Sequence, residues 1–298
     1  MRAFALDAYP VPLPPGHRFP MEKYALTLEA CLQERIFDVD RLAPAPLAPD
    51  AVLLRAHTPA YVTAATTGAL TAPEIRRIGF PWTPDLIRRC RASVGGTLAA
   101  AEAALVDGVA ANLAGGTHHA FAGEGEGFCV FNDVACAALE LLARGVVTRV
   151  AVVDLDVHQG NGTAAILGGH PQVFTLSLHG ERNFPFRKMP STLDVGLPDG
   201  CDDETYLSAL DRALPPVMAF DPQLVLYIAG ADPLRDDRLG RLNMSLEGLA
   251  ERDRRVMTAC RDLGAKVALS MGGGYARPIF PTVAAHVGTF RVAREVFG

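Results

Sequence analysis

The chain has 298 residues, of which 49% are hydrophobic and 20% are charged, a composition typical of one large globular domain. Its net charge of −5 argues against a general nucleic-acid binder, which would normally present a basic face. The sequence has no uninterrupted apolar run of about 18 residues and no signal-peptide layout at its start, so it predicts a cytoplasmic protein without a membrane span. The six cysteines are scattered and form no C-x-x-C pair, so the sequence indicates neither a cysteine zinc cluster nor a disulfide framework.

The first sixty residues give few clear signals. Residues 1–20 are rich in proline and are expected to run irregularly over the surface. A helix is predicted over residues 21–36 and a short strand over residues 51–56. Pro59 then favours a turn or the start of another helix.

Strands and helices alternate through the rest of the chain. Apolar, β-branched runs indicate strands, and the alanine-rich or amphipathic segments between them indicate helices. The predicted strands are 109–113, 146–153, 173–179, 223–229 and 265–271, and the predicted helices are 84–107, 133–143, 203–214, 246–263 and 281–296. This order predicts one α/β domain over residues 1–298, with a mainly parallel central sheet flanked by helices.

The segment that follows the second of these strands carries two carboxylates and an imidazole. Asp154, Asp156 and His158 occupy alternate positions, so they share one side of the extended chain. Burying these groups without partners would be costly, and a divalent metal is the simplest compensation. Oxygen and nitrogen ligands without cysteine suit zinc at an open catalytic site. The alternative is that both aspartates cap the following turn and His158 is a satisfied structural residue.

Four other polar clusters fall at or just beyond the carboxyl ends of predicted strands. Ligands of parallel α/β sheets bind beyond the carboxyl ends of the strands, so the clusters are expected to converge on one site. They are His118-His119 after a double glycine, Ser177 to His179, Asp232, and Tyr275 after three glycines. The loop with Glu124 and Glu126 is either a solvated turn or a means of attracting a cationic substrate.

Together these motifs resemble the zinc-dependent histone deacetylase superfamily, which includes bacterial acetylpolyamine amidohydrolases and shares its core with arginase. The resemblance covers roughly residues 55–290 and is nearer to the class IV branch than to class I. It is carried by the motifs Gly115-Gly116-Thr117-His118-His119, Gly127-Phe128-Cys129-Val130-Phe131-Asn132-Asp133, Asp154-Leu155-Asp156-Val157-His158-Gln159-Gly160-Asn161-Gly162, Gly230-Ala231-Asp232 and Gly272-Gly273-Gly274-Tyr275.

The resemblance implies a role for each matching residue. Asp156, His158 and Asp232 would bind one zinc ion per chain. His119 would be the general base, His118 would assist it electrostatically with Asp154 behind, and Tyr275 would stabilise the oxyanion. The implied acyl-lysine channel has Phe128 and Phe186 as walls, with the Gly127 carbonyl accepting the amide N–H. A structural monovalent cation, such as K⁺, is implied near Asp154, Asp156, His158, Ser177 and Leu178.

Asn161 departs from the class I pattern, which has an aspartate at this position. A neutral amide can orient His119 but cannot stabilise its charged form, whereas the Asp154 carboxylate favours protonated His118. The pair is therefore expected to divide into a charged His118 and a neutral His119, the state that a general base needs.

The leading functional prediction is a zinc amidohydrolase that removes acetyl or longer acyl groups from lysine side chains. One alternative is hydrolysis of a small acylated amine such as an acetylpolyamine, and another is an inactive module that binds acyl-lysine. An arginase-like site with two metals is disfavoured, because Gly160 stands where a further carboxylate ligand would be needed.

Overall fold

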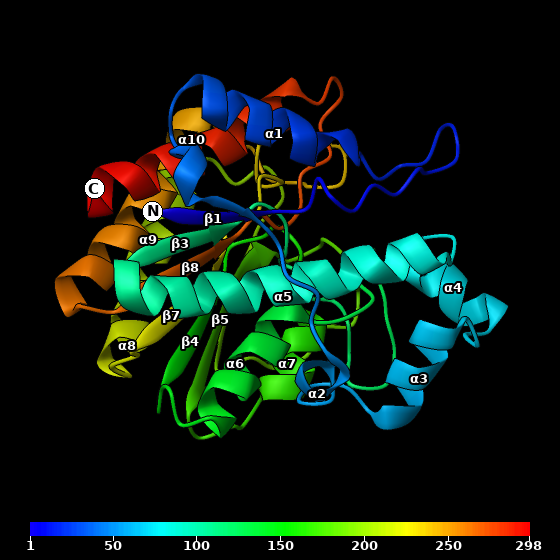
Figure 1. The fold of residues 1–298 in the computed structure, drawn as a ribbon. Coiled ribbons are helices and arrows are strands. Elements are labelled where there is room, and N and C mark those ends of the chain that lie inside the picture. Colours follow the sequence, from blue (N-terminus) through cyan, green and yellow to red (C-terminus); the bar gives the residue numbers. More distant parts are fainter.

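Eight parallel strands form one sheet at the centre of the molecule (Figure 1). The computed structural model describes residues 1–298, and the order across the sheet is β2-β1-β3-β8-β7-β4-β5-β6. The strands are β1 (Arg2–Ala5), β2 (Leu42–Pro44), β3 (Val109–Asn112), β4 (Val150–Asp154), β5 (Val173–Gly180), β6 (Leu193–Leu197), β7 (Leu224–Ile228) and β8 (Lys266–Ser270). The predicted α/β class with a mainly parallel sheet is confirmed, and every strand pair is parallel.

Helices cover both faces of this sheet (Figure 1). One face packs against α1 (Glu22–Gln33), α8 (Asp203–Ala219), α9 (Leu246–Leu263) and α10 (Phe280–Phe297). The other packs against α2 (Asp50–Leu53), α3 (Pro59–Thr67), α5 (Pro84–Asp107) and α6 (Asp133–Ala143). The remaining helices are α4 (Ala72–Ile78), α7 (Asn161–Leu167) and the 3-10 turn η1 (Val39–Arg41). No helix combines the length and the apolar character that a membrane crossing requires.

Two hydrophobic clusters fill the space between the sheet and its helices. On β4, Val150 and Val152 belong to one cluster while Ala151 and Val153 belong to the other. The central strands are buried on both faces, which explains why they appear in the sequence as continuous apolar runs rather than alternating ones. This double burial made the central strands easy to predict.

The edge of the sheet differs from the prediction. Residues 2–5 form β1, although the proline-rich start was expected to be irregular, and β1 pairs with both β2 and β3. The predicted strand at 51–56 is wrong, since residues 50–53 form helix α2, where Val52 and Leu53 pack into the core. A short apolar run does not distinguish a strand from one buried helical turn, and the neighbouring chain decides between them.

Two glycines inside α5 allow a close approach to this helix. A Cβ atom at Gly95 would lie 1.9 Å from the carbonyl oxygen of Pro46, and one at Gly96 would lie 2.8 Å from Oδ1 of Asn112. The cost to helix propensity, about 1 kcal/mol for each glycine, therefore has a packing reason. Gly96 lets α5 lie directly against β3, whose carboxyl end leads into the functional site, and Gly95 makes room for the segment after β2.

Candidate active site

The five polar clusters lie together at the carboxyl ends of the parallel strands. β3 leads into His118 and His119, β4 ends at Asp154, and β7 and β8 lead into Asp232 and Tyr275. Because these strands are neighbours in the order β3-β8-β7-β4-β5, segments far apart in the sequence meet in space.

Asp156, His158 and Asp232 form a buried group of possible metal ligands. Their donor atoms lie within 4.8 Å of one another, and all three side chains are buried. Nδ1 of His158 lies 3.0 Å from Oδ1 of Asp156 and 3.1 Å from Oδ2 of Asp232. Burial opposes the charged imidazole, but the hydrogen bonds with both carboxylates outweigh burial and raise the pKa of His158 to about 10.

The same donors suit a divalent cation. Burial, and then repulsion from Asp156, raises the pKa of Asp232 to about 7, so the two carboxylates compete for compensating positive charge. Carboxylate oxygens and an imidazole nitrogen match the ligand preferences of catalytic zinc. A zinc ion bound by these atoms would displace the His158 proton and satisfy both carboxylates at once.

The triple glycine after β8 holds this group in place. The Gly273 N–H donates to Oδ2 of Asp156 at 2.6 Å, and the Val157 N–H donates to Oδ1 of Asp232 at 2.9 Å. A Cβ atom at Gly273 would lie 1.9 Å from Oδ2 of Asp232. Only glycine lets the backbone pass so close to the two carboxylates.

The tandem histidines have different partners. Nδ1 of His118 lies 2.6 Å from Oδ2 of Asp154, whereas Nδ1 of His119 lies 2.8 Å from Oδ1 of Asn161. Burial disfavours a charged His118, but Asp154 and Asp156 outweigh this and raise its pKa to about 9. Burial and repulsion from His118 hold the pKa of His119 well below its ordinary value. The structure thus gives the two imidazoles opposite pKa shifts, in the directions that the sequence analysis expects.

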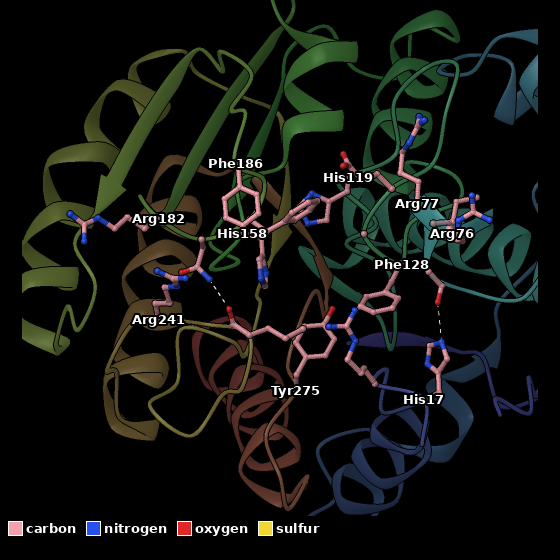
Figure 2. A pocket seen from close by; sticks show the side chains of 18 of the residues that line it. His17, Arg76, Arg77, His119, Phe128, His158, Arg182, Phe186, Arg241 and Tyr275 are labelled. Atoms are coloured by element: carbon pink, nitrogen blue, oxygen red, sulfur yellow. Dashed lines mark hydrogen bonds between the residues drawn. The ribbon is translucent and has the colours of Figure 1, made fainter. Parts of the chain in front are cut away.

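A cavity of about 850 Å³ opens over these groups (Figure 2). His119, His158 and Tyr275 line it, together with Gly127 and Phe128. The Tyr275 N–H donates to Oδ2 of Asp237, and the Tyr275 hydroxyl makes no hydrogen bond within the chain. The hydroxyl, an imidazole and a potential metal ligand therefore face the same space.

Phe184 lies closer to the reactive groups than the predicted wall residue Phe186. The ring centre of Phe184 lies 5.0 Å from that of His119 and 6.4 Å from that of His158. Phe186 also lines the cavity, but it is 85% exposed and contacts the outer side of Phe184. Opposite Phe128, the inner wall is thus Phe184, with Phe186 at the rim.

One further residue at the site, Lys23, had no recognisable signal in the sequence. Lys23 on α1 is fully buried, and its Nζ donates to the Gly272 carbonyl at 3.1 Å. The same Nζ lies 5.3 Å from the ring centres of Phe19, Tyr24 and Tyr275. This hydrogen bond joins α1 to the loop that carries Tyr275, and its two residues are 249 positions apart in the sequence.

Glu126, expected in a solvated turn or as an attractor of cations, lines the same cavity as His119 and contacts Asn161. Its Oε2 accepts a hydrogen bond from Nδ2 of Asn161 at 3.2 Å. This contact fixes which end of the Asn161 amide faces His119, because only Nδ2 can donate to a carboxylate. Glu124, on the same loop, instead pairs with Arg77.

If the chain hydrolyses amides, as its sequence predicts, replacing Glu126 with glutamine should lower kcat roughly 3- to 10-fold, because a neutral acceptor holds the Asn161 amide less firmly. The measurement is kcat at matched zinc content, with Glu124→Gln as the matched control. An unchanged kcat in Glu126→Gln, or an equal loss in the control, would remove the positioning role.

The comparisons with known proteins agree with this geometry. The histone deacetylase domain family matches residues 17–289. An uncharacterized protein of Picosynechococcus sp. is 45% identical over 290 residues, which is 97% of each chain. Histone deacetylase 2 of Arabidopsis thaliana is 37% identical over 189 residues, which cover 62% of this chain and only 49% of the plant protein. The crystal structure of an HDAC homologue from Aquifex aeolicus superposes with a TM-score of 0.82 at 26% identity, covering 100% of this chain and 84% of the homologue. The chain belongs to the histone deacetylase family.

Proposed function

We propose that this protein is a zinc-dependent amidohydrolase that removes acetyl or longer acyl groups from lysine side chains. Membership of the deacetylase family supports amide hydrolysis in general. The observation that carries the finer proposal is that His119, His158 and Tyr275 line one cavity whose inner walls are Phe128 and Phe184. Aromatic walls of this kind suit the long methylene chain of an acylated lysine.

Asp156, His158 and Asp232 would hold the zinc. When bound, zinc would polarise the amide carbonyl and bring the pKa of a water molecule down towards ~7. His119, held neutral by burial and oriented by Asn161, would take a proton from the attacking water and pass it to the leaving amine.

Two other side chains would stabilise the charge that develops during the reaction. His118 keeps its proton because Asp154 lies behind it, so it would supply a fixed positive charge beside His119. The Tyr275 hydroxyl would donate a hydrogen bond to the oxyanion. The products are a carboxylate and a free amine: the water's oxygen ends in the carboxylate, and a proton of the water ends on the amine.

The substrate would lie between the two inner phenylalanines, with the Gly127 carbonyl accepting its amide N–H. Gly127 has a φ of +54°, and a Cβ atom there would lie 2.7 Å from Cδ2 of His119, so a larger residue would crowd the base. We also propose the monovalent cation site at Asp154, Asp156, His158, Ser177 and Leu178. Asp154 and Ser177 are partners in the β4–β5 register, which supports it.

The decisive experiment is hydrolysis of a fluorogenic acetyl-lysine peptide by zinc-loaded protein, before and after chelation. We expect turnover that chelation abolishes and added zinc restores, with one zinc ion per chain. Two tightly bound ions would indicate an arginase-like site instead. No turnover by the zinc-loaded protein, with retained peptide binding, would favour an acyl-lysine-binding module.

A panel of substrates then separates the remaining alternatives. Lysine peptides acylated with chains from acetyl to myristoyl would define the acyl preference. Acetylated polyamines would be assayed in parallel. A higher kcat/KM for them than for the lysine peptides would identify small acylated amines as the substrate class.

A further inference from the structure

Arginine side chains surround the mouth of the active-site cavity. Five of the lining residues are arginines, namely Arg18, Arg76, Arg77, Arg182 and Arg241. Glu126 is the one carboxylate among the lining residues, so these side chains carry five positive charges against one negative charge. The whole chain has a net charge of −5, so the mouth has the opposite sign to the protein around it.

Most of this positive charge is not neutralised within the chain. Arg18, Arg76 and Arg182 are exposed and take part in none of the ion pairs or side-chain hydrogen bonds of the structure. Arg77 pairs with Glu124, and Arg241 lies 3.4 Å from Asp199. The fold therefore does not need the three unpaired guanidinium groups for its own stability, and they remain free to bind a ligand.

The arginines come from separate segments and lie on opposite sides of the cavity. Arg76 and Arg77 are on α4, whereas Arg182 follows β5 and Arg241 precedes α9. In Figure 2, the α4 pair lies on one side of His158 and Tyr275, and Arg182 and Arg241 lie on the other. One anionic group would need only one of these sides. An extended peptide that crosses the mouth, at about 3.3 Å per residue, can place side chains on both.

We propose that the arginines at this mouth bind acidic side chains on both sides of the acylated lysine, so that the preferred substrate is an acyl-lysine within an acidic segment. This inference rests on the proposed deacylase function and specifies its substrate class. The same field opposes the approach of a polyamine or of a lysine-rich tail, because like charges repel at the entrance.

Three acetyl-lysine peptides test the proposal, with glutamate, glutamine or lysine at the two positions on each side. The glutamate peptide should have a kcat/KM roughly three- to tenfold above that of the glutamine peptide, and the lysine peptide should fall below both. Raising the ionic strength from about 0.02 M to about 0.5 M should remove most of this difference. Equal kcat/KM values for the three peptides at low salt would overturn the proposal.

Charge-reversal variants locate the effect. Arg76→Glu and Arg182→Glu, on opposite sides, should each lower the ratio of kcat/KM between the glutamate and glutamine peptides. Arg261→Glu is the matched control, because Arg261 lies at the carboxyl end of α9, before β8 and thus at the opposite edge of the sheet. This control should leave the ratio unchanged, and an equal fall in all three variants would mean that only the overall charge matters.

The same peptides keep this inference separate from the proposed function. If none is hydrolysed by zinc-loaded protein, the deacylase function fails. Dissociation constants of labelled peptides then still test whether the arginines at the mouth bind acidic side chains. Tighter binding of the glutamate peptide, lost in Arg76→Glu and Arg182→Glu, would support it. Equal binding of the glutamate and glutamine peptides would refute it.

Discussion

Replacing His119 with alanine should lower kcat for an acetyl-lysine peptide by ~10²–10⁴-fold, the range typical of losing a general base. His119 lines the cavity, and burial together with repulsion from His118 keeps its pKa well below the ordinary value. It is therefore unprotonated at neutral pH and can accept a proton. His118 is held protonated beside Asp154 and cannot take this role without first losing that proton.

His118→Ala is the matched control, since it removes an adjacent imidazole of the same size. It should lower kcat less than His119→Ala, because it removes a stabilising charge and leaves the proton acceptor in place. Both variants require a zinc determination, so that a loss of metal is not mistaken for a loss of the base. If His119→Ala kept most of its activity while His118→Ala lost it, the two roles would have to be exchanged.

The sequence was sufficient to predict the centre of the fold and the convergence of the site. β4 and β7 are buried on both faces, so their apolar runs are uninterrupted, although the strand predicted over 146–153 begins only at Val150. Once the strands are parallel, the polar residues after each must meet at one edge, whatever the details of the loops. The proximity of Asp232 to His158, 74 residues away in sequence, follows from this rule.

Loop conformation was beyond the same reasoning. Phe184 and Phe186 flank one proline, and nothing local shows which ring points inward. In the folded chain, Nζ of Lys188 donates to the carbonyls of Asn183 and Pro185, and Nδ2 of Asn183 donates to the carbonyl of Leu239. These contacts draw the loop over the cavity, with Phe184 beneath and Phe186 outside.

Charge shows the same limit in another form. A net charge of −5 describes the average surface and does not show where the charges lie. The arginines at the cavity mouth come from segments up to 223 positions apart, between Arg18 and Arg241, so the sequence shows no basic cluster. Only the fold brings them together, so the sequence alone points to a cationic substrate near Glu124 and Glu126 as one alternative and does not indicate an acidic one.

Replacing Tyr275 with phenylalanine should lower kcat by ~10²–10³-fold, the loss seen when one oxyanion donor is removed. Burial, followed by the nearby Asp156 and Asp232, holds the pKa of Tyr275 well above its usual value, so its hydroxyl stays protonated and can donate. Phenylalanine keeps the ring, whose centre lies 6.1 Å from that of Phe128 and 5.3 Å from Nζ of Lys23. The substitution thus removes one hydrogen-bond donor and little packing.

A second tyrosine separates this catalytic effect from a structural one. The Tyr61 hydroxyl donates to the Val130 carbonyl at 2.8 Å in the core, away from the cavity. Tyr61→Phe should therefore lower the free energy of unfolding by about 1 kcal/mol and leave kcat nearly unchanged. Tyr275→Phe should lower kcat and leave the free energy of unfolding nearly unchanged, because its hydroxyl has no partner in the folded chain to lose. Denaturant unfolding and kcat, measured on both variants at equal zinc content, test whether each substitution changes only the quantity expected. A Tyr275→Phe enzyme that kept more than half of its kcat would show that the oxyanion is stabilised by other groups.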